Sequence, residues 1–234
     1  MAAKAVDAGS GTADEKSSTR VEPVGERLRE FRTERDLSVR ALARAVGVSA
    51  SLISQIEHGK ASPSVATLYA IVSELGISMD SLFATSPAES GSDDPIQLQP
   101  PGDQPGSHTR YWAAPSEGPV LRAANRLSLT MATGVRWERL TASHDPRIEF
   151  LYCTYPVGSE SCPADALMTH SGSEYGVVES GRLGATVGER SYELEPGDSI
   201  AFESTTPHRL WAIGEEEVSA LWVVAGREND PRVS

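Results

Sequence analysis

The chain has 234 residues with a formal net charge of −12 at pH 7, and 39% of its residues are hydrophobic. This length allows two modest domains, and no apolar run approaches the roughly 20 residues of a membrane-spanning helix. The N-terminus has no apolar secretory core, and two cysteines, Cys153 and Cys162, are too few for a disulfide framework. We therefore expect a cytoplasmic protein without a membrane partner.

The N-terminal residues mix small side chains with alternating charges and show no hydrophobic periodicity. We predict a disordered tail over residues 1–22, because such a sequence cannot bury enough apolar surface to fold. A helix is predicted over about residues 25–34, where Leu28 and Phe31 have the spacing of an inward face and the arginines would point outward.

Residues 38–60 predict two short helices joined by a tight turn, which is a helix-turn-helix. Ala43 is small enough for the two helices to approach closely, Gly47 can adopt the positive φ of the turn, and Ser49 can cap the second helix. The polar positions of the second helix, among them Ser51 and Gln55, would then face away from the core. They form a candidate surface for reading the major groove of DNA.

A fourth helix is predicted after Pro63 and Ser64, with its end at Gly76, and a short last helix around residues 79–83. The segment from about Val24 to Phe83 resembles the DNA-binding domain of the Cro and XRE family of repressors. The matching features include the sequence ISQIEHGK at the end of the second motif helix and the LGIS turn before the last helix. The resemblance implies a five-helix, lambda-repressor-like domain over residues 23–84. It also implies base and phosphate contacts from Arg40, Arg44, Ser49, Ala50, Ser51, Ser54, Gln55 and Lys60. A helical bundle that binds no DNA, as in an adaptor domain, is the alternative.

The negative charge is concentrated outside this segment. Residues 23–84 carry seven basic and seven acidic residues, whereas residues 109–226 carry sixteen acidic residues against nine arginines. Since DNA phosphates repel the acidic part, we expect contact through the local arginines of the N-terminal part and a strong dependence on dimerisation.

Residues 85–107 are rich in Pro, Gly, Ser and acidic residues and predict a linker. After it, short runs rich in Val, Ile, Tyr, Trp and Thr alternate with turn residues, which predicts an all-β domain of antiparallel strands over residues 108–227 and a short tail over 228–234. Residues 168–181 and 195–208 resemble the two motifs of the cupin superfamily. The predicted fold class is therefore α + β with two domains, the second being a cupin jelly-roll barrel.

The cupin resemblance implies a metal site formed by His170, Glu174 and His208, a set that binds Fe, Mn, Zn or Ni as one divalent ion. The chain departs from the family at Met168, where the first motif normally has a histidine and a thioether is a poor ligand for such ions. The alternative is that the two histidines line a pocket for an organic effector, for which Met168, Tyr175 and Phe202 are the further candidates.

Together the two resemblances imply a transcriptional regulator whose cupin domain senses a small molecule or a metal. We expect no catalysis, and a homodimer that binds double-stranded DNA at an inverted-repeat operator. The alternative is an iron cupin oxygenase resembling the hydroxypropylphosphonate epoxidases, which also join a helix-turn-helix-like domain to a cupin. The absence of lysine from the predicted cupin domain argues against a phosphonate substrate.

Overall fold

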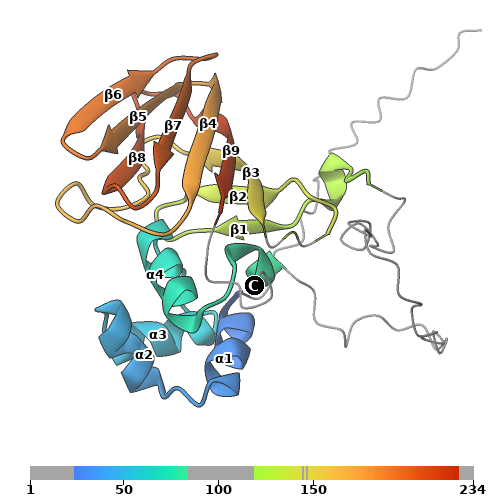
Figure 1. Cartoon of the computed structure of the whole chain (residues 1–234), viewed down its shortest axis with the longest axis vertical. Coiled ribbons are helices and arrows are strands. Elements are labelled where there is room, and N and C mark those ends of the chain that lie inside the picture. The colour runs from blue at the N-terminus through green and yellow to red at the C-terminus, as the bar shows by residue number, and fades with distance from the viewer. Residues whose placement is uncertain (1–23, 84–118, 144, 146, 227–234) are drawn as a thin grey trace, which may run out of the picture.

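The computed structural model describes residues 24–83, 119–143, 145 and 147–226. The predicted tails and the predicted linker lie outside the described residues, and the domain boundaries stay predictions. The N-terminal part contains α1 (Val24–Glu34), α2 (Val39–Val46), α3 (Ala50–Glu57) and α4 (Val65–Leu75), followed by the 3-10 helix η1 (Met79–Phe83) (Figure 1). The expected last helix is therefore a 3-10 helix, and the α-helices number four among the described residues. None of the helices described is long and apolar enough to cross a membrane.

Local capping explains where the helices begin and end. Ser38, Ser49 and Ser64 precede α2, α3 and α4, and each side-chain oxygen accepts a hydrogen bond of 3.1 Å from the backbone N–H three residues later. Gly47 and Gly76 follow α2 and α4 with φ of 79° and 60°, a conformation that glycine adopts without strain. The predicted roles of Ser49 and Gly47 are confirmed.

One arginine of α1 is buried, contrary to the expectation that these arginines point outward. Arg32 is 8% exposed and Glu57, the last residue of α3, is 3% exposed. The Arg32 guanidinium donates to both carboxylate oxygens of Glu57, at 2.5 and 2.9 Å, and to the Leu37 carbonyl at 2.6 Å. Because a buried carboxylate needs a partner, Arg32 is held inside and ties α1 to the end of α3.

The C-terminal part is a sandwich of two antiparallel sheets. One sheet has the order β1 (Ser128–Thr130), β2 (Arg136–Arg139), β3 (Ile148–Tyr155), β9 (Val218–Ala225), β4 (Ser173–Ser180) and β7 (Ser199–Glu203). The other has the order β6 (Arg190–Leu194), β5 (Arg182–Val187) and β8 (His208–Ile213), and the short 3-10 helix η4 (Ala123–Asn125) precedes β1. The antiparallel all-β architecture expected for the second part is confirmed.

Two glycines of the sandwich make room for tryptophan rings. A Cβ atom on Gly176 would lie 2.0 Å from the ring of Trp222, and one on Gly184 would lie 2.0 Å from the ring of Trp211. Each glycine is the register partner of its tryptophan on the neighbouring strand, so the ring lies across the glycine backbone. At Gly176 this places the Trp222 indole beside the interior of the sandwich.

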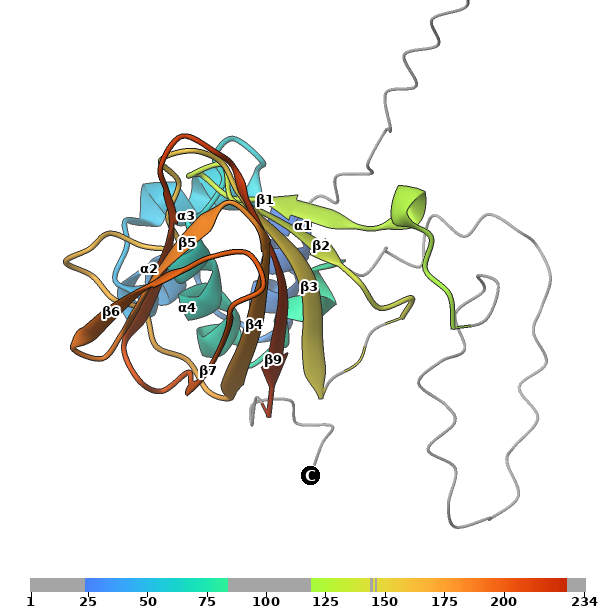
Figure 2. The ribbon, with the colours of Figure 1, turned by 90° about the horizontal axis from the view of Figure 1, so that it is seen from above.

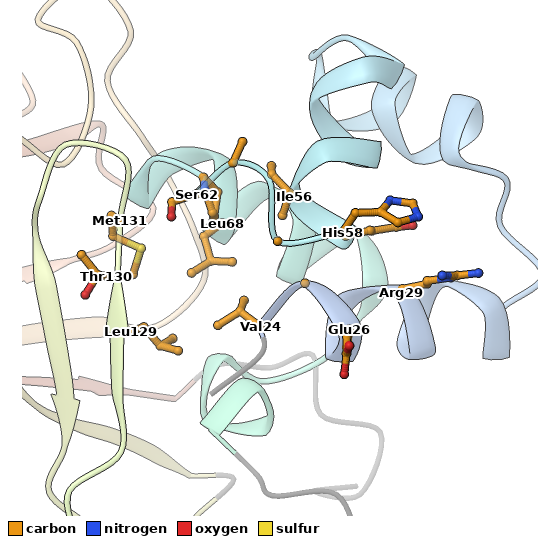
Figure 3. Close-up of a pocket in the computed structure, with 15 residues that line it drawn as sticks. Val24, Glu26, Arg29, Ile56, His58, Ser62, Leu68, Leu129, Thr130 and Met131 are labelled. Atoms are coloured by element: carbon orange, nitrogen blue, oxygen red, sulfur yellow. The ribbon is translucent and has the colours of Figure 1, made fainter. Parts of the chain in front are cut away.

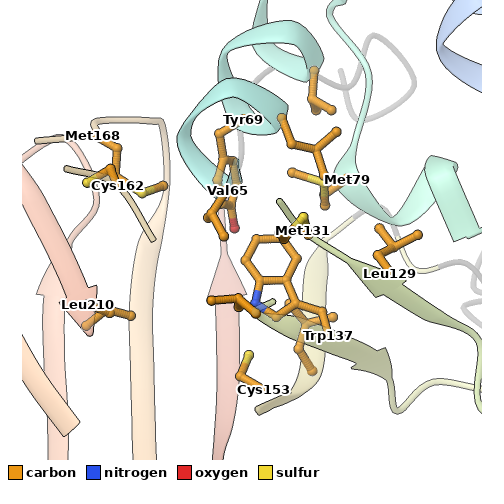
Figure 4. Close-up of a cluster of buried hydrophobic side chains, with 14 of the residues drawn as sticks. Val65, Tyr69, Met79, Leu129, Met131, Trp137, Cys153, Cys162, Met168 and Leu210 are labelled. Atoms are coloured by element: carbon orange, nitrogen blue, oxygen red, sulfur yellow. The ribbon is translucent and has the colours of Figure 1, made fainter. Parts of the chain in front are cut away.

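The helices gather at one end of the sandwich, with α4 nearest the sheets (Figures 1 and 2). The N–H of Ala66 donates to the Ser161 carbonyl at 3.3 Å, and the N–H of Ala132 donates to the Pro63 carbonyl at 2.9 Å. Figure 4 shows Val65 and Tyr69 pointing from α4 toward Trp137. The buried side chains of both parts therefore form one continuous hydrophobic core.

Candidate metal centre and nucleic-acid interface

The predicted DNA-reading residues belong to or flank α2 and α3, which lie in the group of helices at one end of the molecule (Figure 1). Ser51 and Gln55 are exposed on α3, and Ala50 and Ser54 are partly buried. The exposed residues around them are Ser49, which caps α3, together with Arg40, Arg44 and Lys60. Among the described residues, none forms an ion pair with Arg40, Arg44 or Lys60. The surface therefore offers uncommitted cations around short polar side chains.

The three predicted metal ligands converge inside the sandwich. His170 lies just before β4, Glu174 is in β4 and His208 begins β8, so the centre joins the two sheets. Glu174 Oε1 lies 2.9 Å from His170 Nε2 and 3.1 Å from His208 Nε2. Bonds of about 2.1 Å that meet at right angles place neighbouring ligand atoms about 3.0 Å apart. The two spacings at Glu174 Oε1 fit neighbouring ligands of one ion, and all three ligand atoms lie within 4.8 Å of one another.

Hydrogen bonds orient each of these side chains. Nδ1 of His170 lies 3.0 Å from the Ser171 carbonyl, and Nδ1 of His208 lies 2.9 Å from the Thr206 carbonyl. A carbonyl oxygen only accepts, so both Nδ1 atoms carry the proton and both Nε2 lone pairs face the centre. The Trp222 indole N–H donates to Glu174 Oε2 at 2.7 Å, which leaves Oε1 to face the two Nε2 atoms.

The convergence leaves three acceptor atoms without a donor. His170 Nε2, Glu174 Oε1 and His208 Nε2 are buried and have no hydrogen-bond partner of normal geometry among the described residues. Buried acceptors at this separation repel one another unless positive charge lies between them, and a divalent ion or added protons on the imidazoles supply that charge. The cluster can therefore hold a metal ion.

The ionisation of the centre agrees with this reasoning. Burial raises the pKa of the Glu174 carboxyl, but in the absence of an ion, protons added to the His170 and His208 imidazoles supply hydrogen bonds and charge that outweigh burial and hold the pKa well below its usual range. Burial lowers the pKa of His208, but the hydrogen bond and charge of Glu174 outweigh it and raise the pKa above its ordinary value. An ionised carboxylate beside positive charge is the favoured state.

The cavity beside the centre is small. Its volume is about 20 Å³, which is enough for one water molecule or ion and too little for an organic effector. Met168 lies in its wall and is 8% exposed, and the Phe202 ring lies 5.1 Å from the His208 ring. Tyr175 is 51% exposed on the outer face of β4, so this candidate for the effector pocket does not line the cavity beside the centre. Adjacent strand residues face opposite sides, and Glu174 takes the inner one.

A larger cleft lies between the helices and β1 (Figure 3). It has a volume of about 470 Å³ and includes the first turn of α1, the turn after α3 and β1. Val24, Leu68 and Leu129 form part of its apolar floor, and Arg29 and His58 lie at its rim. None of the predicted site residues lines it.

Two residues of the centre were not predicted. Trp222 holds Glu174, and Tyr69 of α4 stacks on His170 with ring centroids 4.1 Å apart and an interplanar angle of 6°. Gly176 is the sequence feature that could have indicated Trp222, because a glycine inside a strand often marks a close approach of another group. No local pattern connects Tyr69 with the first cupin motif, which contains His170.

In the comparisons with known proteins, the N-terminal and C-terminal parts match two different family models. Residues 28–82 match the helix-turn-helix family model and residues 151–224 match the cupin domain model. The chain is 26% identical over 185 residues to the HTH-type transcriptional regulator PuuR of Escherichia coli K12, covering 79% of this chain and 84% of that protein.

The solved structures support the fold. An HTH_3 family transcriptional regulator from Vibrio cholerae is similar over 88% of this chain and 96% of its own, with a TM-score of 0.56 and 24% identity. The match to a hydroxypropylphosphonic acid epoxidase from S. wedmorenis covers 89% of this chain and 99% of the epoxidase chain, with 19% identity and a TM-score of only 0.38. The first similarity shows the fold, and the second is too low to support an argument about function.

Proposed function

We propose that this chain, a helix-turn-helix transcriptional regulator with a C-terminal cupin domain, reads operator DNA with α3 and senses the state of its His/Glu/His centre. The observation that carries the proposal is the exposed polar surface of α3, which lies at the far end of the molecule from the acidic sandwich. The proposal includes that the protein acts inside the cell, where it can reach DNA.

The side chains on this surface suit the two kinds of DNA contact. Gln55 can pair with an adenine edge through two hydrogen bonds, and Ser51 is short enough to let the helix approach the bases. Arg40, Arg44 and Lys60 surround them and would contact phosphates, which sets orientation and affinity without sequence preference. Specificity would then depend on Gln55 and Ser51, and salt dependence on the three cations.

The centre is proposed to hold one divalent ion through His170 Nε2, Glu174 Oε1 and His208 Nε2. The convergent acceptors described above fit such an ion, with Fe, Mn, Zn and Ni as the candidates by ligand type. When bound, the ion supplies the positive charge that these atoms lack and links β4 of one sheet to β8 of the other. An organic effector would need a different place, and the 470 Å³ cleft beside α3 is of suitable size.

A homodimer completes the proposal. On the outer face of the larger sheet, Tyr175 pairs with Val223 and Val177 with Leu221, which makes an uncharged patch that includes a groove of about 290 Å³. Two copies with the same negative charge can approach best through such a patch. A two-fold pair would present its α3 helices about 34 Å apart to an inverted repeat.

The second candidate function is an iron-dependent oxygenase, which the His/Glu/His set favours. The 20 Å³ cavity disfavours it, because an organic substrate has no space beside the centre in this arrangement. Oxygen consumption after anaerobic loading with Fe(II), with and without small alkylphosphonates, tests this candidate. Sustained turnover would replace the regulator proposal.

Selection from a randomised duplex library with the full-length protein tests the proposed function. We expect enrichment of an inverted repeat with half-sites one helical turn apart. A library that shows no enriched sequence, both with and without Zn²⁺ and cell extract, contradicts sequence-specific regulation.

A further inference from the structure

Tyr69 is a residue of the DNA-binding part that lies inside the sensing part. It is in α4 and is 4% exposed. Its ring stacks on His170, its hydroxyl donates to Glu149 Oε2 at 3.3 Å, and the edge of its ring meets Trp137 with centroids 5.6 Å apart. Contacts with three different residues of the sandwich therefore fix the phenol ring in place.

The helix that carries Tyr69 connects the two parts. Backbone hydrogen bonds from Ala66 to Ser161 and from Ala132 to Pro63 hold the start of α4 against the sandwich. The other side of α4 packs against α2, the first helix of the helix-turn-helix. A shift of the Tyr69 ring therefore moves the element on which the reading helices rest.

The same ring also limits the size of the centre. Tyr69 and Glu174 both line the 20 Å³ cavity, so the phenol closes this end of the sandwich with His170 beneath it. The cavity has room for an ion, whereas a larger ligand would have to displace part of its wall, of which Tyr69 is the residue contributed by α4.

We propose that Tyr69 is the positioning residue through which occupancy of the His/Glu/His centre reaches the DNA-binding helices. The proposal rests on the metal site of the proposed function. A cation at His170 Nε2 withdraws electrons from the imidazole, and an electron-rich phenol face stacks more strongly on such a ring. Ion binding therefore favours the docked position of α4, and docking favours the ion by the same factor.

The test uses the full-length protein and Zn²⁺ as the probe. Zn²⁺ affinity is measured by calorimetry, and hydrogen exchange of the α4 amides is measured with and without Zn²⁺. The variants are Tyr69→Phe, which keeps the stacked ring, and Tyr69→Leu and Tyr69→Ala, which remove it. Tyr192→Ala, at a tyrosine that is 42% exposed on β6, is the matched control.

We expect Zn²⁺ to slow α4 exchange at least about fivefold in the wild type, Tyr69→Phe and Tyr192→Ala, since coupling between sites is typically 5- to 150-fold. Tyr69→Leu and Tyr69→Ala should bind one Zn²⁺ with their three ligands intact and change α4 exchange less than twofold. In Tyr69→Ala, added phenol should refill the vacated space and restore the Zn²⁺ response. If Tyr69→Ala does not fold, Tyr69→Leu, which keeps more of the apolar packing, answers the same question.

The outcomes separate this proposal from the regulator function. Zn²⁺ binding without any effect on α4 exchange in the wild type overturns the coupling, as does an equal effect in Tyr69→Leu or failure of the wild type to bind Zn²⁺. A Tyr69-dependent response in a protein that selects no duplex supports the coupling and rejects the regulator function.

Discussion

Trp222→Phe is the most direct test of how the centre is built. The substitution keeps an aromatic ring over Gly176 and removes one donor, the indole N–H that lies 2.7 Å from Glu174 Oε2. Glu174 is 3% exposed, so bulk water does not replace the donor. A hydrogen bond to a buried charged group contributes about 1.5–3 kcal/mol, and we expect the free energy of unfolding of the metal-free protein to fall by that amount.

The effect on metal binding follows from the same contact. Without the indole, Oε2 is left without this donor and the carboxylate is free to rotate, so Oε1 no longer points reliably at the two Nε2 atoms. Loss of such an orienting partner typically weakens metal affinity by about 10- to 100-fold, or about 1.4–2.7 kcal/mol. Calorimetric Zn²⁺ titration against a competing chelator measures the affinity, and urea denaturation followed by circular dichroism measures stability.

Trp211→Phe is the control, because Trp211 packs over Gly184 in the other sheet and its indole N–H has no hydrogen-bond partner among the described residues. It should bind Zn²⁺ with wild-type affinity. A Trp222→Phe protein that binds Zn²⁺ within twofold of the wild type would refute the argument that this indole orients Glu174.

Three further predictions concern the ion pair, the reading surface and the ligand set. Arg32→Met leaves the Glu57 carboxylate buried without its partner, so the free energy of unfolding measured by urea denaturation should fall by about 3–5 kcal/mol. Adding Glu57→Met should recover most of this loss. Equal stability of Arg32→Met and the wild type would contradict the prediction. Gln55→Ala should weaken binding to the selected operator by about 1–3 kcal/mol and leave non-specific DNA binding unchanged. Fluorescence anisotropy titrations measure both affinities, and Ser73→Ala, at an exposed position of α4, is the control. His208→Ala removes one of three ligands and should abolish stoichiometric Zn²⁺ retention after dialysis, measured by elemental analysis; an undiminished metal content would place the ion elsewhere.

Two expectations failed although the sequence contained the relevant information. Arg32 is four residues after Leu28, so its spacing places it on the inward face of α1, and only its charge suggested an outward position. Tyr175 directly follows Glu174 in a strand, and neighbouring strand residues face opposite sides. If Glu174 faces the interior, Tyr175 cannot. In both cases residue type was given more weight than position.

The sequence by itself determined the features that depend on short stretches of chain. Caps and helix ends such as Ser49 and Gly47 are set by hydrogen bonds over three or four residues, so a local pattern is sufficient. The types of the candidate metal ligands were also available, because His170, Glu174 and His208 lie in two recognisable motifs.

Only the tertiary structure decided what surrounds those ligands. The sequence identifies Tyr69 and Trp222 as apolar side chains that will be buried, but hydrophobic burial has no direction and does not specify a partner. The partner depends on how α4 docks on the sandwich and how β9 aligns with β4, which many weak contacts between distant segments settle together. For this reason the contact between Tyr69 of α4 and His170 of the centre emerges only from the folded chain.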